Sequence, residues 1–265
     1  MILDKMNNSL PLVSVVMPAY NAVRWIAEAI VSVQKQTVAD WELLVIDDGS
    51  TDMTCSVVEQ LAAGDPRIRL IRCEANQGVA YARNLGLDMS RGQYVALLDS
   101  DDVWYPNKLE QQIALAEQSG AEVIYCSYGI VNDQGTKICE DFIVPQTTCF
   151  NEALVKSVMS CSTVLFTRQI VDAYRFGSSF YHEDLALWLR ILRDGHTARG
   201  VTDPMADYRI AEGSRSFDKR HSILCRWDIY RDFLGMSRIK SMGLLSRYAV
   251  LGLRKYRRVA NHATR

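Results

Sequence analysis

The sequence predicts an α/β fold, in which a mostly parallel central sheet is flanked by helices and a helical extension follows at the C-terminus. Strand-like and helix-like segments alternate through the first half of the chain. The strand-like segments are continuous apolar runs, which are typical of strands buried on both faces of a parallel sheet. The last part of the chain is predicted to form two helices that carry most of the basic residues.

The first half contains the most regular pattern. An apolar segment, 12–17, ends at Pro18, and the next segment has apolar residues on one helical face. Gly64 and Pro66 end the second helix. The predicted strands cover 12–17, 41–46, 68–72, 94–98 and 121–128, and the predicted helices cover 23–33, 52–62, 79–89 and 108–118.

The second half is less regular. A turn sequence, Asn132-Asp133-Gln134-Gly135, predicts a hairpin over 129–145. A short strand is expected at 162–166. Apolar residues recur at helical spacing over 184–193, where Gly195 ends the helix, and two helices follow from Lys219 onward.

Composition limits the possible functions. The chain has 265 residues, of which 48% are hydrophobic and 23% charged, and this mix excludes a disordered or low-complexity chain. The net charge is -1, but residues 219–265 hold twelve Lys and Arg against two Asp and Glu, so an acidic body is followed by a basic tail. Charge gives no indication of a nucleic-acid partner.

Cysteine usage and hydropathy point to the cytoplasm. The seven cysteines include no C-x-x-C pair, so we expect reduced thiols and neither a disulfide framework nor a zinc site. The first twelve residues lack a signal-peptide pattern, and no segment approaches the ~20 apolar residues that span a bilayer.

Polar residues follow three of the predicted strands, where parallel α/β sheets bind their ligands. Pro18-Ala19-Tyr20-Asn21 follows the first strand, Asp47-Asp48-Gly49-Ser50 the second, and Asp99-Ser100-Asp101-Asp102 the fourth. Two of these three tips are therefore clusters of acids.

Asp99, Asp101 and Asp102 would repel one another at the end of a buried strand unless a cation or hydrogen-bond donors compensate them. Carboxylate oxygens suit Mg²⁺ or Mn²⁺, held together with substrate phosphates. A solvated acidic turn is the alternative, and the position after a buried strand favours a ligand site.

The residues that follow the first and second predicted strands indicate a nucleotide-binding site. Asp47 or Asp48 could accept hydrogen bonds from a ribose or a base, although either Asp48 or Ser50 could instead cap the next helix. Tyr20 could stack on a base, although a lone tyrosine is more often a packing residue.

Five motifs together resemble the family 2 glycosyltransferases, which have the GT-A fold and use nucleotide sugars. They span about residues 12–110 in the order of that family, with a weaker continuation to 210. The motifs are Pro18-Ala19-Tyr20-Asn21, Ser32-Val33-x-x-Gln36-Thr37, Glu42-Leu43-x-x-Ile46-Asp47-Asp48-Gly49-Ser50-Thr51-Asp52, Asn76-x-Gly78-x-x-x-Ala82-Arg83-Asn84-x-Gly86 and Leu98-Asp99-Ser100-Asp101-Asp102.

The resemblance implies a role for each tip. Pro18, Ala19 and Tyr20 would flank the base, usually uracil. Asp48 would bind the edge of the base, with Asp47 nearby. Asp99, Ser100 and Asp101 would form the D-x-D motif, with Asp101 as a ligand of Mn²⁺ or Mg²⁺ and Asp99 facing either the ribose or the same ion. Arg83 would either approach the nucleotide or brace the aspartates.

The resemblance also implies an inverting reaction, which needs a base on the acceptor side. His182-Glu183-Asp184 matches the Glu-Asp pair of the family, so Asp184 would be the general base and Glu183 would orient the acceptor. The alternative is that both acids favour only the first turn of a helix. Tyr208-Arg209 and Gly213-Ser214-Arg215-Ser216 resemble the stretch that folds over the diphosphate.

The chain departs from the processive synthases, because it lacks their Gln-x-x-Arg-Trp motif and membrane helices. The resemblance therefore implies one sugar added to a glycan, or to an undecaprenyl-diphosphate-linked acceptor, in lipopolysaccharide, O-antigen or other surface polysaccharide synthesis. The expected division is a catalytic domain, 1–218, with a nucleotide half (1–110) and an acceptor half (111–218), and a basic extension, 219–265.

The extension has two interpretations. Arg254-Lys255-x-Arg257-Arg258 lies beside apolar residues, which fits a helix on the anionic inner face of the cell membrane. It also fits a solvated helix, or one docked on the acidic body.

Other functions are less favoured. A nucleotidyltransferase would need a Gly-rich phosphate loop after the first strand, and a dehydrogenase would need G-x-G-x-x-G. A non-catalytic module that binds nucleotide sugars is the remaining alternative. A nucleic-acid binder could use the basic tail, but the acidic tips argue against it, because they would repel phosphates unless a metal is present.

Overall fold

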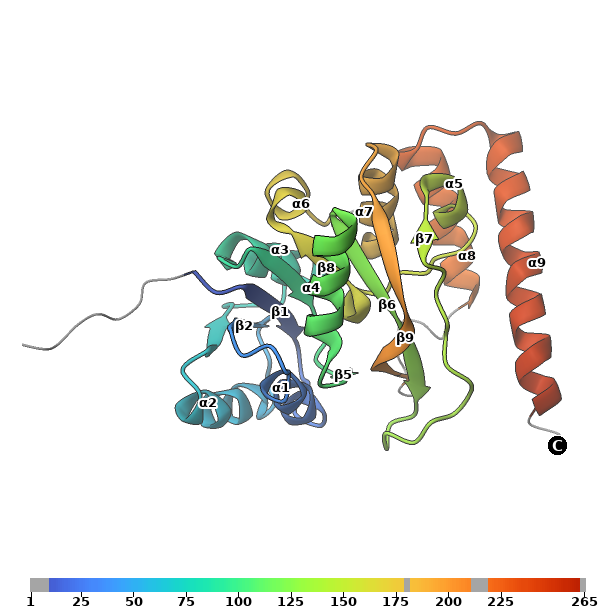
Figure 1. Ribbon diagram of the computed structural model, residues 1–265. Coiled ribbons are helices and arrows are strands. Elements are labelled where there is room, and N and C mark those ends of the chain that lie inside the picture. Colours follow the sequence, from blue (N-terminus) through green and yellow to red (C-terminus); the bar gives the residue numbers. More distant parts are fainter. Residues whose placement is uncertain (1–9, 179–181, 211–218, 263–265) are drawn as a thin grey trace, which may run out of the picture.

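The computed structural model describes residues 10–178, 182–210 and 219–262, with side chains in the last range described for 223–250 (Figure 1). Strands and helices alternate through its first half, as the sequence predicts. The strands are β1 (Val13–Ala19), β2 (Trp41–Asp47), β3 (Ile68–Arg72), β4 (Tyr94–Leu97), β5 (Val103–Trp104), β6 (Val123–Val131), β7 (Thr147–Thr148), β8 (Leu165–Thr167) and β9 (Ala198–Arg209).

The helices connect these strands and continue beyond the last of them. They are α1 (Ile26–Gln34), α2 (Thr54–Gly64), α3 (Val79–Met89), α4 (Lys108–Ser119), α5 (Phe150–Ala153), α6 (Arg168–Ala173), α7 (Glu183–Arg193), α8 (Lys219–Asp228) and α9 (Arg238–His262). A 3₁₀ turn, η1 (Cys161–Thr163), precedes β8, and a π-helical turn, η3 (Ile229–Phe233), follows α8.

The described strands form one mixed sheet in the order β3-β2-β1-β4-β8-β6-β9-β5, with β7 paired to β9. β1 is parallel to β2 and β4, β2 is parallel to β3, and β6 is parallel to β9. β8 runs antiparallel to both β4 and β6, so β6 and β9 point the same way as the first four strands. The carboxyl ends of β1, β2 and β4 therefore meet at one edge.

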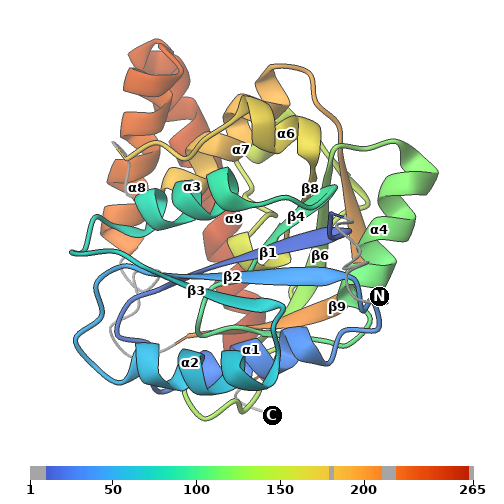
Figure 2. The same ribbon diagram turned by 90° about the vertical axis from the view of Figure 1, so that its left-hand side faces the viewer.

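Helices cover both faces of the sheet (Figure 2). One core joins α1, α2 and α4 to side chains such as Val15 and Leu43. The other joins α3, α6 and α7 to side chains such as Val16 and Leu44. Alternate residues of β1 and β2 thus face opposite cores, which explains why their sequences are continuously apolar.

Gly86 lets α3 lie against the sheet. A Cβ atom at this position would stand 2.2 Å from Cγ1 of Val16 on β1, so only glycine allows this approach. Arg83 lies three residues earlier on the same helix and lines the edge at which β1 and β4 end.

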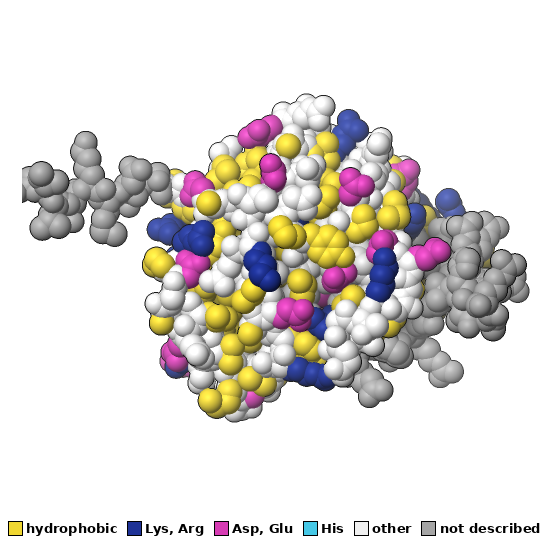
Figure 3. Space-filling model, turned by 60° about the horizontal axis from the view of Figure 1, so that its bottom comes forward, with side chains coloured by type: hydrophobic (Ala, Val, Ile, Leu, Met, Phe, Trp, Pro, Cys, Tyr) yellow, Lys and Arg dark blue, Asp and Glu magenta, His cyan; other side chains and the backbone are white. Residues whose placement is uncertain are grey.

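The C-terminal helices pack on the body. Ile229 and Tyr230 of η3 are fully buried and belong to the same core as Trp188 of α7. Within the described residues, no helix has the length and hydropathy required to cross a membrane. Acidic and basic side chains are interspersed on the face shown in Figure 3.

Some predicted elements differ from the structure. The expected hairpin over 129–145 has only isolated bridges, at Tyr128–Phe142 and Val131–Lys137, although its turn forms around Asn132. The expected strand over 162–166 is divided between η1 and β8. The sequence analysis did not predict β5, β7, β9, α5 or α6. β9 contains Pro204 and several polar residues, and its pairing with β6 is interrupted by register shifts.

Candidate active site

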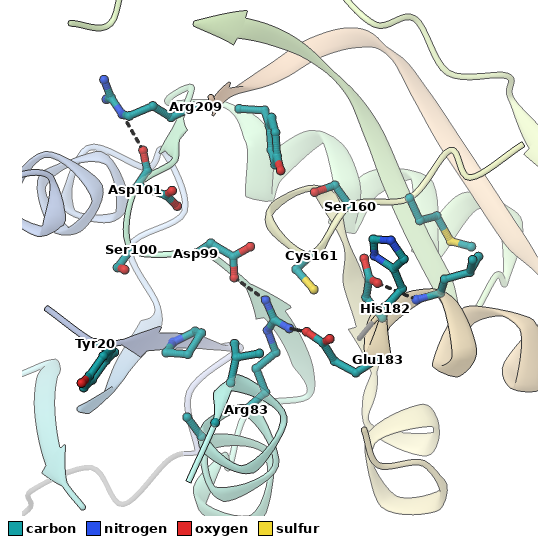
Figure 4. A pocket seen from close by; sticks show the side chains of 18 of the residues that line it. Tyr20, Arg83, Asp99, Ser100, Asp101, Ser160, Cys161, His182, Glu183 and Arg209 are labelled. Atoms are coloured by element: carbon teal, nitrogen blue, oxygen red, sulfur yellow. Dashed lines mark hydrogen bonds and ion pairs between the residues drawn. The ribbon is translucent and has the colours of Figure 1, made fainter. Parts of the chain in front are cut away.

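A cavity of about 960 Å³ opens at the carboxyl ends of β1 and β4. Its walls come from these strand ends, from the first half of α3, from the segment 157–161 and from the start of α7 (Figure 4). Arg226 and Tyr248 of the C-terminal helices complete the lining. Of the predicted site residues, Asp47 does not line the cavity. The others all do: Pro18, Ala19, Tyr20, Asp48, Arg83, Asp99, Ser100, Asp101, Glu183 and Asp184.

Arg83 connects the two sides of the cavity. Its Nη2 atom donates a hydrogen bond to Oδ1 of Asp99 at 2.7 Å, and its Nη1 atom donates to Oε1 of Glu183 at 2.8 Å (Figure 4). Burial acts to lower the pKa of this arginine, but the charges of Asp99 and Glu183 outweigh it and raise the pKa further. Arg83 is therefore a permanent cation that is shared between one acid on each side of the cavity.

The carboxylates of the turn after β4 differ in their exposure to the cavity. Asp99 and Asp101 line the cavity, whereas Asp102 is 1% exposed and does not. Asp102 accepts a hydrogen bond from Oγ of Ser162 at 2.5 Å and another from the backbone N–H of Arg209 at 2.8 Å. Ser162 also accepts the backbone N–H of Asp99 at 3.0 Å. Asp102 and Ser162 thus anchor the turn that presents the other two acids.

The surroundings of Asp101 disfavour its charged form. Burial, together with the neighbouring Asp99, raises the pKa of Asp101 to about 6. A bound cation would reverse this effect, because it favours the ionised form.

Asp99 and Asp101 fit a divalent ion that is shared with a substrate. The described residues hold no group of three or more His, Cys, Asp or Glu side chains arranged around a metal position. Mg²⁺ and similar ions are often held by one or two carboxylates and completed by substrate phosphates. Asp99 and Asp101 at the cavity wall supply that minimum.

Backbone N–H groups donate hydrogen bonds to the two aspartates at the carboxyl end of β2. Asp48 accepts the backbone N–H of Gln77 at 2.9 Å and that of Gly78 at 2.8 Å, which fixes the loop before α3. Asp47 accepts the backbone N–H of Ser50 at 3.1 Å. Asp52 accepts the backbone N–H of Thr54 at the start of α2. Asp48 therefore does not cap α2, yet it remains part of the cavity wall.

Tyr20 lies at the cavity mouth with 49% of its surface exposed. A tyrosine that served only to pack the core would be buried, so this exposure favours the interpretation that its ring is available to a ligand (Figure 4).

Glu183 and Asp184 stand at the first turn of α7, and they differ in their partners. Glu183 is paired with Arg83, whereas Asp184 accepts the backbone N–H of Leu185 at 2.7 Å. Burial and the neighbouring Glu183 raise the pKa of Asp184. A raised pKa makes a carboxylate a stronger base, so Asp184 fits proton abstraction better than Glu183 does.

Arg209 fixes the position of the acidic turn that follows β4. Its Nε atom donates to the backbone carbonyl of Asp101 at 2.7 Å, and its Nη2 atom pairs with Glu28 at 2.7 Å. Both Tyr208 and Arg209 line the cavity, as their resemblance to the diphosphate-covering stretch requires. The predicted continuation, Gly213 to Ser216, lies outside the described residues.

Sequence analysis did not identify Ser162, Arg226 or Tyr248. Ser162 anchors the acidic turn, and the other two line the cavity from α8 and α9. None belongs to a motif, and each is distant along the chain from the strand tips. Only the fold brings them to the site.

Comparisons with known proteins agree with this geometry. The family described as Glycosyl transferase family 2 matches residues 14–174. The chain is 33% identical to the Bacillus subtilis protein TuaG, whose name assigns it to the glycosyltransferases of teichuronic acid biosynthesis, over 94% of this chain and 99% of the relative. It is 38% identical to WfgD of Escherichia coli, over 92% of this chain and 95% of the relative. WfgD is a UDP-Glc:α-D-GlcNAc-diphosphoundecaprenol β-1,3-glucosyltransferase.

Solved structures share the fold. Residues 1–349 of Staphylococcus aureus TarS, in complex with UDP-GlcNAc, match with a TM-score of 0.68 and 19% identity, over 89% of this chain and 71% of that chain. A mannosyltransferase of Pyrobaculum calidifontis, in complex with GDP-Man and Mn²⁺, matches with a TM-score of 0.67 and 19% identity, over 92% of this chain and 70% of that chain. The predicted GT-A-like fold is confirmed.

Proposed function

The chain belongs to glycosyl transferase family 2, and we propose that it transfers one hexosyl or N-acetylhexosaminyl unit from a UDP-sugar to an undecaprenyl-diphosphate-linked glycan. We propose further that the reaction inverts the anomeric centre, depends on Mn²⁺ or Mg²⁺ and builds a surface polysaccharide. One observation carries the proposal: Arg83 bridges Asp99, at the end of β4, and Glu183, at the start of α7, on the wall of one cavity.

In this proposal the donor lies along the strand tips. Tyr20 stacks on the base, and Pro18, Ala19 and Asp48 complete its pocket. Asp99 and Asp101 hold the divalent ion, which neutralises the charge that grows on the leaving diphosphate. Ser100 lies between them on the cavity wall. Arg83 holds the side chain of Asp99 in place through its hydrogen bond.

The acceptor lies at the start of α7. Asp184 takes the proton of the acceptor hydroxyl as that oxygen attacks the sugar on the side opposite the leaving group. Glu183, fixed by Arg83, orients the acceptor. The names of two relatives support the substrate class: one acts on a diphosphoundecaprenol-linked GlcNAc, and one belongs to teichuronic acid biosynthesis.

A transfer assay tests the proposal. Purified protein with Mn²⁺ is given a series of UDP-sugars and an acceptor that carries N-acetylglucosamine on an alkyl diphosphate. We expect transfer of one sugar with inverted anomeric configuration. Stoichiometric binding of the nucleotide sugar without any transfer would instead favour the non-catalytic binding module.

We also propose that the C-terminal helices contact the anionic inner face of the cell membrane. Apolar side chains are exposed on both: Ile223 and Leu224 on α8, and Ile239, Met242 and Val250 on α9. Exposed cations of α9, such as Lys240 and Arg247, lie among them. Such a mixture suits a helix at a lipid surface. The basic cluster at Arg254, Lys255, Arg257 and Arg258 lies outside the residues whose side chains are described.

Vesicle flotation tests this contact. The protein should bind vesicles that contain anionic lipid, and the double variant Ile239→Ser with Met242→Ser should bind more weakly. Ile143→Ser, at an exposed isoleucine in the segment between β6 and β7, is the matched control and should bind normally. Equal binding by all three proteins would contradict a membrane role for α9.

A further inference from the structure

Arg226 differs from the other arginines of the cavity wall. Three arginines line this cavity: Arg83, Arg209 and Arg226. Arg83 is paired with two carboxylates, and Arg209 is paired with Glu28. Arg226 has no carboxylate partner in the part of the chain that the structure describes. It is nevertheless only 4% exposed.

The position of Arg226 is fixed by neutral groups. Its Nη1 atom donates to the backbone carbonyl of Leu154 at 3.1 Å and lies 3.5 Å from the hydroxyl oxygen of Tyr230. Its guanidinium carbon lies 4.0 Å from the centre of the Tyr248 ring. Tyr230 in turn donates to the same Leu154 carbonyl. Among the described residues, the Nε and Nη2 atoms of Arg226 have no hydrogen-bond partner.

A buried cation with no counterion among the described residues is costly to bury, and an anionic ligand would remove that cost. The planar donor fork of arginine matches a phosphate with two parallel hydrogen bonds. Arg226 is already oriented by Leu154 and Tyr248, so little side-chain freedom remains to be lost when a ligand binds. These features describe a preformed phosphate subsite.

The subsite lies away from the expected donor position. The donor diphosphate is assigned to Asp99 and Asp101, at the ends of the parallel strands. The helix α8, which carries Arg226, lies beyond the β9 side of the sheet, whereas β1 and β2 lie on the other side (Figure 1). The same C-terminal helices expose Leu224 and Ile239, which suit contact with lipid. An acceptor with a lipid tail would bring its phosphates past these helices.

We propose that Arg226, backed by Tyr248, binds the diphosphate of the lipid-linked acceptor. The inference rests on the proposed function, because it assumes a diphosphate acceptor, and it names the residues of the C-terminal extension that select it. The extension is then part of the acceptor site as well as a membrane contact.

Two soluble acceptors test the proposal with UDP-glucose as the donor. One carries N-acetylglucosamine on a short-chain alkyl diphosphate, and the other is the neutral alkyl N-acetylglucosaminide. The wild type should show a KM at least about tenfold lower for the diphosphate acceptor, as expected for charge-assisted hydrogen bonds. Arg226→Gln should raise that KM by about tenfold and leave the KM of the neutral acceptor unchanged.

Further measurements separate this role from others. Arg226→Lys keeps the charge and should give an intermediate KM, and Lys35→Gln, which removes an exposed cation at the end of α1, should match the wild type. The Kd of UDP, measured by calorimetry, should stay within about twofold of the wild type in Arg226→Gln. The melting temperature of each variant is recorded to identify any that unfold.

Several results would overturn the proposal. Equal KM values of the two acceptors in the wild type would exclude a diphosphate subsite without any variant. A weaker Kd for UDP in Arg226→Gln would assign the arginine to the donor diphosphate instead. Equal losses with both acceptors would indicate a structural role. Absence of transfer from any donor by the wild type would contradict the proposed function itself and this subsite with it.

Discussion

Asp99 and Glu183 are joined through one guanidinium group, because Arg83 donates a hydrogen bond to each of them at 2.7 and 2.8 Å. Asp99 follows β4 in the first half of the chain, and Glu183 begins α7 in the second. The bridge therefore fixes the turn after β4 relative to the start of α7, on the two sides of the cavity.

Replacement of Arg83 by Gln should destabilise the protein strongly. Two acids would remain near each other without their cation, and removal of one partner from a buried ion pair costs about 3–5 kcal/mol. Urea denaturation measures the free energy of unfolding. Arg72→Gln is the control, since its pair with Glu59 is exposed and should contribute less than about 1 kcal/mol. Equal stabilities of the two variants would contradict the bridge.

Ser162 should act on donor use through the acidic turn. Ser162→Ala removes the hydrogen bonds to Asp102 and to the backbone N–H of Asp99, and unsatisfied buried groups cost about 1–3 kcal/mol each. The KM of the donor should rise together with the loss of stability. Ser56→Ala, at an exposed serine of α2, should change neither quantity. A normal donor KM in Ser162→Ala would show that the turn holds its shape without this serine.

The fold could be predicted where the strands are buried on both sides. β1, β2 and β4 were predicted to within two residues at each end, because their apolar runs end at polar tips. β9 was missed, since its register shifts and Pro204 remove the alternation that marks a strand. The mixed topology could not be predicted, because β8 is three residues long and is preceded by a 3₁₀ turn.

The site could be predicted where it follows strands. Tyr20, Asp48, Asp99 and Asp101 lie on one cavity because parallel strands end at the same edge. Asp184, which was predicted through its motif, lines the same cavity. Arg226 was not predicted, because a basic residue in a basic helix gives no local signal. Its burial without a carboxylate partner among the described residues is visible only in the structure.

Asp101→Asn should stabilise the metal-free protein at neutral pH. The pKa of Asp101 is about 6 in the folded state, and its ordinary value is 3.8. The folded state therefore binds the proton more tightly, and the free energy of unfolding falls as the pH rises from about 4 to 6. Asparagine has no charge to lose, so at pH 7 the variant should be more stable by up to about 3 kcal/mol.

Urea denaturation in the presence of a chelator, at pH 4 and pH 7, checks this prediction. The difference between wild type and Asp101→Asn should shrink toward zero at pH 4. A wild type that is more stable than the variant at pH 7 would show that Asp101 is compensated without a metal.

Asp184→Asn should separate binding from chemistry. The amide keeps the shape of the side chain but cannot accept the acceptor proton, so kcat should fall by about 100-fold or more. The Kd of UDP should not change, because Asp184 is assigned to the acceptor side. Asp172→Asn, at an exposed acid of α6, serves as the control in both assays. A normal kcat in Asp184→Asn would show that Asp184 is not the general base.

The central claim is that the strand tips form a metal-dependent UDP site, and calorimetric titration of UDP with and without Mn²⁺ tests it most directly. We expect binding that needs Mn²⁺ and that disappears in Asp101→Asn, although the variant is folded. Tighter binding of GDP than of UDP would support a nucleotide site at the strand tips but would indicate a GDP-sugar as the donor. Binding of UDP with the same affinity in the absence of Mn²⁺ and in Asp101→Asn would contradict the account.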